Sequence, residues 1–411
     1  MRVRAVAVLI VAATWGGLDS ASAQTLRPIT FEEARLAAGQ DGPAVVLAAR
    51  RVGLAQAQID VAGALTNPTV TLTTARQTAR LGASVAVPVP VFGQRSRAVA
   101  AAEAEAYSAR LDVAAAAVEA RFLATVAWID LWEAQERARL LHQAAADAAR
   151  VAGIAQEKFS AGAGPEVDVL RTRADRVRAE AEASGADATI LAAAARLATS
   201  IGGPEAVGLR ASGGPGFSAM PVNVQALTDS IHRTPLLRRD AADVTAAAAR
   251  VQVEQRLRWP IVSFLLTVDQ GDPTLPATDV IGGVSFDLPV LNLRGGAIAR
   301  ARAEQSVAQA TLELDAARIR HDTADAAARA EAAGGRAAAL AAQVLPALEA
   351  ARQMTEEGYR DGRVDLLRLI EAQRAVLEAR LANAEAQAAW QRAIGEVERA
   401  AGTHGETADA P

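Results

Sequence analysis

The feature that most constrains the fold of this 411-residue chain is an internal repeat. Three sequence landmarks each occur twice, in the same order and about two hundred residues apart. The pairs are NPTVTL at 67–72 with WPIVSF at 259–264, VAVPVPVFGQ at 85–94 with VSFDLPVLNLRGG at 284–296, and KFSAG at 158–162 with GYRDG at 358–362. Repeated landmarks predict two copies of one supersecondary unit. We place the copies at residues 24–201 and 223–400, with a linker rich in Gly and Pro at 202–222 and a disordered tail at 401–411.

Each copy predicts the same order of elements: a helix of medium length, two short strands, a very long helix, a tight turn that contains Gly, and a second long helix. The medium helices are expected at residues 31–64 and 235–258, and Thr30 with Glu33 predicts a capping box at the start of the first one. Residues 95–158 include no proline. Roughly 64 residues at about 1.5 Å each therefore predict a helix about 95 Å long.

The helices that return from the tight turns carry small or apolar residues at alternating spacings of three and four. This spacing predicts coiled-coil packing with a left-handed supercoil, and alanine in the seam permits close helix approach. In copy one the seam comprises Leu170, Ala174, Val177, Ala181, Ser184, Ala188, Leu191 and Ala195. In copy two it comprises Leu367, Ile370, Arg374, Leu377, Leu381, Ala384 and Ala388, of which only Arg374 is charged.

Residues 1–23 have the pattern of a secretory signal peptide. Arg2 and Arg4 are followed by a short apolar run, and the segment ends with small residues at Ala21 and Ala23. The chain contains no cysteine, which excludes disulfides, thiolate metal ligands and a lipid attached to an N-terminal cysteine. A net charge of −4 gives no electrostatic attraction for nucleic acid.

The short strands alternate apolar and polar residues, as half-exposed strands do. Their apolar face meets either a protein core or, in a membrane barrel, lipid. Lengths of about nine residues suit a tilted strand that crosses a bilayer. The strand boundaries are marked by Pro68, Pro90, Pro260 and Pro289, where the missing N–H does little harm.

Four strands cannot close a barrel in lipid, because their open edges would leave backbone groups unpaired. The chain is therefore expected to share a barrel with copies of itself. Three copies give twelve strands, whereas two copies would give eight, and side chains fill the lumen of an eight-stranded barrel.

At the duplicated landmarks the chain resembles the TolC family of outer-membrane efflux proteins, over nearly the whole mature sequence. The resemblance implies a mainly α fold with a small β part: long coiled-coil helices that form an α-barrel, and four strands per chain that contribute to a 12-stranded trimeric transmembrane β-barrel. The start of the first strand at Asn67 and Pro68, and the Gly93-Gln94-Arg95 segment, are most similar to the heavy-metal branch. A system for drugs or organic solutes is the alternative.

The resemblance also implies a function and partners. The chain would form a passive homotrimeric duct in the outer membrane of a Gram-negative bacterium, and would export metal ions or small toxic compounds. It would dock to a periplasmic adaptor and an inner-membrane pump of the RND type. The alternative is a soluble periplasmic coiled-coil protein with a structural or adaptor role, which predicts extraction without detergent.

The two tight turns are the candidate functional sites, because they lie at the far end of the helices from the strands. By resemblance, Asp168 and Asp365 would line the periplasmic aperture, where carboxylate rings favour cations, and Tyr359 with Arg363 would tie neighbouring helices together. The alternative for both aspartates is a role as helix N-caps. The turn residues expected to meet the adaptor are Phe159, Gly162 and Gly362.

Two further expectations concern the membrane and chemistry. Trp259 beside Pro260 is a candidate anchor at the membrane interface, and the loops at 75–82 and 269–279 are expected to face the exterior. The four histidines stand alone in the sequence, so we expect no metal site. No nucleophile elbow or phosphate-binding loop is present. The sequence therefore predicts no catalytic residue and no cofactor, and we expect the protein not to be an enzyme.

Overall fold

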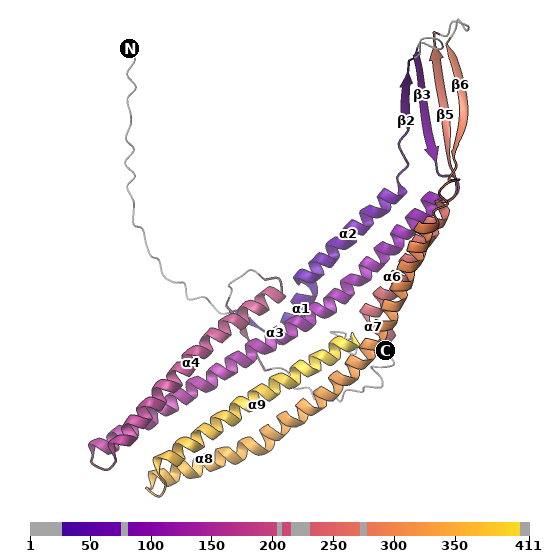
Figure 1. Ribbon diagram of the computed structural model, residues 1–411. Helices are drawn as coiled ribbons and strands as arrows, with labels where there is room; N and C mark the ends of the chain where they lie inside the picture. Colours follow the sequence, from indigo (N-terminus) through magenta and orange to yellow (C-terminus); the bar gives the residue numbers. More distant parts are fainter. Residues whose placement is uncertain (1–26, 75–80, 204–207, 215–230, 272–277, 403–411) are drawn as a thin grey trace, which may run out of the picture.

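The computed structural model describes residues 27–74, 81–203, 208–214, 231–271 and 278–402. The molecule is elongated, with a small sheet at one end and two helical tips at the other (Figure 1). The expected signal peptide, the disordered tail and much of the linker at 202–222 lie outside the described residues.

The sheet at one end has four antiparallel strands in the order β2-β3-β5-β6. They are β2 (Thr69–Thr73), β3 (Leu81–Val89), β5 (Ile261–Gln270) and β6 (Asp279–Asp287). The prolines expected at the strand boundaries lie just outside these spans. The chain thus has the four strands that the alternating pattern predicts.

The register collects the apolar side chains on one face of the sheet. Val85 lies opposite Leu266, and Phe264 lies opposite both Val87 and Val284. Since side chains alternate along a strand, the neighbouring Ser, Thr and Asp residues lie on the other face. Phe264 and Val284 are exposed, so nothing in a single chain covers the apolar face.

Between residues 31 and 63 the structure differs from the expected single helix. It has two helices, α1 (Phe31–Asp41) and α2 (Pro43–Gly63). The break occurs because Gly42 is extended, as a residue before proline prefers, and Pro43 starts the second helix. The capping box of α1 is confirmed: Thr30 Oγ1 accepts from the N–H of Glu33 at 3.2 Å, and the Glu33 carboxylate accepts from the N–H of Thr30 at 2.8 Å.

Two long helical hairpins form the body of the molecule. The first consists of α3 (Gln94–Ser160) and α4 (Glu166–Ser200). The second consists of α7 (Gly295–Ala339), a π-helical turn (Leu340–Val344), α8 (Leu345–Arg360) and α9 (Leu366–Ala401). A shorter helix, α6 (Pro235–Arg256), packs on both α3 and α7.

The main core lies at mid-length, where α1, α3, α4 and α9 meet. Trp128 is fully buried there and donates its Nε1–H to the carbonyl of Ile29 at 2.9 Å. Ile29 belongs to a two-stranded parallel sheet of β1 (Arg27–Ile29) and β4 (Leu209–Ala211). These three-residue strands were not expected, because they are too short to show a period.

The two expected seams have different outcomes. In α9 the seam packs inside the chain: Ile370, Ala384 and Ala388 are buried. In α4 every seam residue is exposed, and a different face, with Ala183, Ala186 and Leu197, packs inside the chain. The spacing was read correctly, but α4 carries two apolar faces and only one is covered.

None of the described helices has a stretch long and apolar enough to cross a membrane.

Candidate functional site

The two tip turns have nearly the same backbone geometry. Gly162 and Gly362 have φ of 70° and 72°. The N–H of Gly162 donates to the carbonyl of Phe159 at 2.9 Å, and the N–H of Gly362 to that of Tyr359 at 3.1 Å. Glycine adopts this left-handed conformation without the steric cost of a side chain. Both turns therefore require Gly at this position.

The two tip aspartates occupy different helix positions. Asp365 is the N-cap of α9, and its carboxylate accepts from the N–H of Arg368 at 3.2 Å. The N-cap of α4 is Pro165, so Asp168 is the third residue of the helix and the N-cap alternative is wrong for it. Asp168 still lies in the first turn, where the helix dipole favours negative charge.

Tyr359 joins the second tip to the first hairpin. Its side chain is 8% exposed and packs with Val151 of α3 and Ile370 of α9. The Nζ of Lys158, the only lysine in the sequence, lies 3.9 Å from the centre of the Tyr359 ring. A cation over an aromatic face is electrostatically attracted to it.

Arg363 and Phe159 remain on the tip surface. The Arg363 guanidinium lies 2.5 Å from the carboxylate of Asp361 in the same turn, so within one chain it does not bridge the hairpins. Phe159 is exposed at the end of α3. The surface that the turns offer to a partner is thus polar on one hairpin and aromatic on the other.

An ion pair between the hairpins was missed by sequence reasoning. Arg374 of α9 donates to the carboxylate of Asp175 of α4 at 2.5 Å. It stands beside a cavity of about 320 Å³ between the two hairpins, lined on its apolar side by Leu141, Val151 and Ile370. The charged residue inside an otherwise apolar seam was the available signal.

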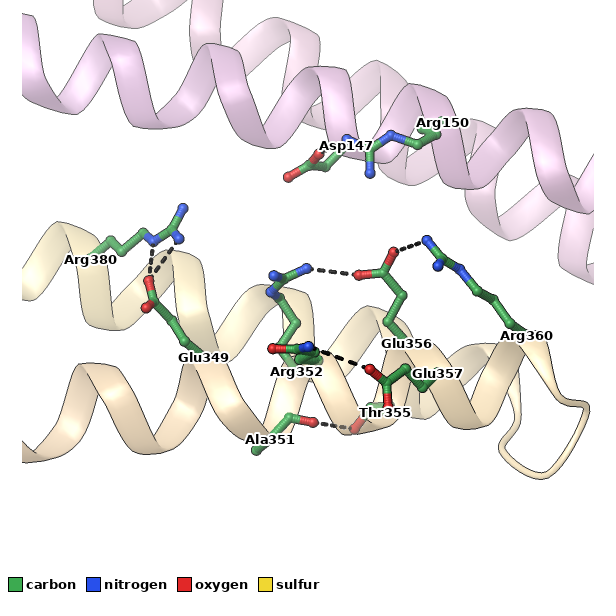
Figure 2. Close-up of polar contacts among 11 residues, drawn as sticks. Asp147, Arg150, Glu349, Ala351, Arg352, Thr355, Glu356, Glu357, Arg360 and Arg380 are labelled. Carbon is green, nitrogen blue, oxygen red and sulfur yellow. Dashed lines mark hydrogen bonds and ion pairs between the residues drawn. The ribbon is translucent and has the colours of Figure 1, made fainter.

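The second hairpin carries ion pairs of its own, some of them on the side that faces the first hairpin (Figure 2). Glu356 pairs with Arg352 at 2.9 Å and with Arg360 at 2.8 Å within α8. Arg380 of α9 donates to Glu349 of α8 at 2.7 Å. Among the described residues, the ion pairs of α8 stay within α8 or go to α9.

α2 and α4 lie on the same flank of the molecule (Figure 1), and each carries an exposed apolar stripe. On α4 the stripe is the exposed seam, where Leu170, Val177 and Leu191 are the large members and Leu191 is 70% exposed. On α2, Leu47 and Leu54 are exposed one heptad apart. α2 and α4 each pack on α3, and the residues of both stripes stay exposed.

The opposite flank carries a matching stripe on α7 that sequence reasoning missed. All its members are exposed and follow spacings of three and four, and the stripe continues into the π-helical turn at Ala342: Val307, Ala310, Leu314, Ala317, His321, Ala324, Ala328, Glu331, Gly335, Ala338 and Ala342. The buried face of α7, which includes Ile319, Ala326 and Ala330, packs on the other side of the helix. The spacing of alanines along this helix was the available signal in the sequence.

The sheet repeats this arrangement at its edges. In the described sheet, β2 and β6 each pair on one side only. The edge of β2 lies on the flank of α2, and the edge of β6 on the flank of α7 (Figure 1). The four-stranded sheet thus has an unpaired edge on each flank, next to the stripes of α2 and α4 on one side and the stripe of α7 on the other.

The polar face of the sheet is acidic. The charged residues within the four strands are Asp269, Asp279 and Asp287, and Asp269 lies directly opposite Asp279. Among the described residues, no group of three or more His, Asp or Glu is placed to hold a metal ion. The three carboxylates therefore spread negative charge over this face of the sheet and do not form a cluster of metal ligands.

Trp259 lies at the junction of sheet and helices. Its ring is half exposed and stacks on Phe92, with ring centres 5.5 Å apart. The Gln94 side-chain amide donates to the carbonyls of Trp259 and Pro260 at 3.3 and 3.2 Å. Gln94 thereby fixes the start of α3 to the start of β5.

The sequence matches known proteins over most of its length. Residues 37–203 match the family described as outer membrane efflux protein. The cobalt-zinc-cadmium resistance protein CzcC of Cupriavidus metallidurans is 24% identical over 359 residues, which cover 86% of this chain and 85% of that protein.

Solved structures share the fold. The outer-membrane channel OprN superposes with a TM-score of 0.74 at 22% identity, covering 90% of this chain and 89% of that one. The CmeC outer membrane channel of Campylobacter jejuni gives a TM-score of 0.77 at 14% identity, covering 90% and 85%. CusC gives 0.76 at 14% identity, covering 90% and 92%. The expected TolC-like architecture of long helices with four strands per chain is confirmed.

Proposed function

We propose that this chain, which is similar to the outer membrane efflux protein family over residues 37–203, is the outer-membrane duct of a tripartite efflux system, built from three copies. The observation that carries this proposal is the pair of complementary flanks. One flank has the unpaired edge of β2 and exposed apolar stripes on α2 and α4, and the other has the unpaired edge of β6 and one exposed stripe of mostly small residues on α7. A duct formed by a ring of chains uses both flanks of every chain.

The strand edges give the first reason for a ring. In lipid, each unpaired backbone group at an edge costs several kcal/mol. If β6 of one copy pairs with β2 of the next, three copies close a barrel of twelve strands. The exposed apolar face, with Phe264 and Val284, then meets lipid, and the acidic face lines the lumen.

The helix stripes give the second reason. The stripe of α4 on one copy packs against the stripe of α7 on the next, in a head-to-tail contact that closes a ring. Leu191 and Gly335 both lie about seven helical turns from the tip ends of α4 and α8. Leu191 of one copy would therefore lie against Gly335 of the next copy, where the absence of a side chain leaves room for it.

The tips are the periplasmic aperture in this proposal. Asp168 and Asp365 would line it, and Tyr359 with Arg363 would hold neighbouring helices together in the closed state. The exposed Phe159, with the turns at Gly162 and Gly362, would meet a periplasmic adaptor. The adaptor would link the duct to an inner-membrane pump of the RND type, which supplies the energy.

The proposed cargo is a metal cation, with small toxic compounds as the alternative. The similarity to a cobalt-zinc-cadmium resistance protein supports a metal system. The strand carboxylates Asp269, Asp279 and Asp287 would give the lumen nine negative charges in three copies, and carboxylates favour cations. The duct itself performs no chemistry. Trp259 would mark the membrane interface, and residues 1–23 would direct export to the outer membrane.

A deletion strain tests the cargo. Cells without this chain are expected to become more sensitive to cobalt, zinc and cadmium salts, and to recover with the full chain. A chain with Leu191→Asp, which places a charge on the α4 stripe, should not restore resistance, whereas Thr189→Asp on an exposed polar face of the same helix should. If deletion sensitised cells only to organic compounds, the metal assignment would be wrong.

A further inference from the structure

The junction between the sheet and the long helices presents an apolar loop that the rest of the chain leaves uncovered. In this loop, between β6 and α7 (Figure 1), Leu291 is 100% exposed, and Val290 and Leu293 are exposed on either side of it. A cluster of exposed apolar side chains marks an interaction site. We propose that this loop inserts into the periplasmic leaflet of the outer membrane, and that arginines beside it bind the phosphate of an anionic phospholipid.

The loop is held in a fixed shape. The side chain of Asn292 accepts from the N–H of Arg294 at 2.9 Å. Arg294 has a φ of 56°, the only positive φ among the described residues other than glycine, and its guanidinium donates to Glu254 of α6 at 2.6 Å. A residue keeps such a conformation only where its surroundings determine it. Leu291 therefore stands on a support that is already ordered, so insertion costs little conformational entropy.

The corresponding loop of the first repeat has the same pattern. The two sequences are PVFGQR at 90–95 and PVLNLR at 289–294. Val91 and Phe92 are exposed in the first loop, as Val290 and Leu291 are in the second. Each chain thus carries two apolar loops at the base of the sheet, and a ring of three chains would carry six.

The loops continue the apolar face of the sheet. Val89 and Phe286 both lie opposite Val262, so β3 and β6 end at the same level. Side chains alternate along a strand, so Leu288 extends the face of Phe286 toward the loop, and both are exposed. The face that meets lipid in the proposed barrel therefore runs without a break into the loop. This continuity favours lipid over a protein partner as the occupant.

Arginines at the same junction supply positive charge for a lipid headgroup. Arg258 is exposed and has no ion-pair partner among the described residues. Arg95 and Arg97, in the first turn of α3, donate to a backbone carbonyl at 2.6 Å and to a side-chain amide at 2.7 Å, so their bonds go to neutral groups. Asp287, at the end of β6, lies on the opposite face of the sheet from Phe286. Guanidinium groups bind phosphate through paired hydrogen bonds.

Apolar insertion and headgroup binding together would fix the depth of the barrel in the membrane, as aromatic and basic residues do at membrane interfaces. This placement rests on the proposed function, because it takes the sheet as the part of the chain that lies in the membrane.

A fluorescent label at position 291 tests insertion. Because the sequence contains no cysteine, Leu291→Cys can be labelled at a single site with a nitrobenzoxadiazole group. In trimers reconstituted into vesicles of phosphatidylcholine and phosphatidylglycerol, a nitroxide on the lipid acyl chain should quench this label several-fold more than the same label at Met354→Cys. Met354 is also exposed but lies on α8, far from the sheet. Equal quenching would overturn the inference, and so would loss of trimers on labelling position 291, because the loop would then lie between copies.

Arg258→Gln tests the headgroup contact. Native mass spectrometry of trimers released from the same vesicles measures the ratio of retained phosphatidylglycerol to phosphatidylcholine. The substitution should lower this ratio about fivefold, the factor that corresponds to about 1 kcal/mol for one basic residue near an anionic surface. Arg171→Gln, at an exposed position near the tip of α4, should leave the ratio unchanged. An unchanged ratio with Arg258→Gln would overturn the phosphate contact.

The oligomeric state in the same samples separates this proposal from the proposed function. Intact trimers that need detergent, with no quenching at position 291, would reject the lipid loop and leave the proposed duct standing. A single chain that stays in solution without detergent would reject the duct, and the loop with it.

Discussion

At the scale of single residues, Asp240 on α6 is unusual because it is a buried carboxylate. It is 2% exposed; one oxygen accepts from Arg239 at 2.6 Å, and the other has no partner among the described residues. Burial raises the pKa of Asp240 above its usual value despite the favourable Arg239, and the nearby Asp315 and Asp243 act in the same direction. The folded state therefore binds a proton at this site more readily than the unfolded chain does.

The raised pKa gives a pH dependence with a definite sign. The contribution of protonated Asp240 to stability is fully present below the unfolded pKa of about 3.9 and is lost as pH rises through the folded pKa. Asp240→Asn removes the buried charge, so its stability relative to the wild type should be greater at pH 7.5 than at pH 4. Thermal unfolding at both values measures this, with Asp60→Asn at an exposed position of α2 as the control. A difference that is the same at both pH values would contradict the assignment.

At the scale of elements, the link between the hairpins can be measured. Arg374 and Asp175 are both partly exposed, so the pair is expected to contribute about 0.5–1 kcal/mol. A double-mutant cycle with Arg374→Gln and Asp175→Asn should yield a coupling energy of that size in the free energy of unfolding. Arg137→Gln, at an exposed position of α3, should show no coupling to Asp175→Asn. Zero coupling between Arg374 and Asp175 would show that this ion pair does not stabilise the contact between the hairpins.

The elements also show what could be predicted from the sequence. Alternation and proline positions predicted the four strands, and the proline-free run predicted α3, because both signals are local. The break at Gly42 was visible as a Gly-Pro pair but was overridden by the helical pattern on either side. The covered face of α4 could not be predicted, since a helix with two apolar stripes does not reveal which one its own chain covers. The Arg374–Asp175 pair depends on how the hairpins sit together, which no local pattern specifies.

At the scale of the whole molecule, the exposed apolar stripes become buried only if copies of the chain pack against one another. A charge on the α4 stripe would be buried in such a contact without a partner, at a cost of several kcal/mol per copy. Leu191→Asp should therefore shift the protein from trimers to single chains on size exclusion in detergent, while Thr189→Asp should leave trimers intact. Trimers of unchanged stability with Leu191→Asp would place this stripe outside the interface.

The ring of three chains is the central claim, and native mass spectrometry of the mature protein, extracted from outer membranes in detergent, tests it most directly. The account predicts a particle of three chains that needs detergent to stay in solution. A single chain that remains in solution without detergent would contradict it.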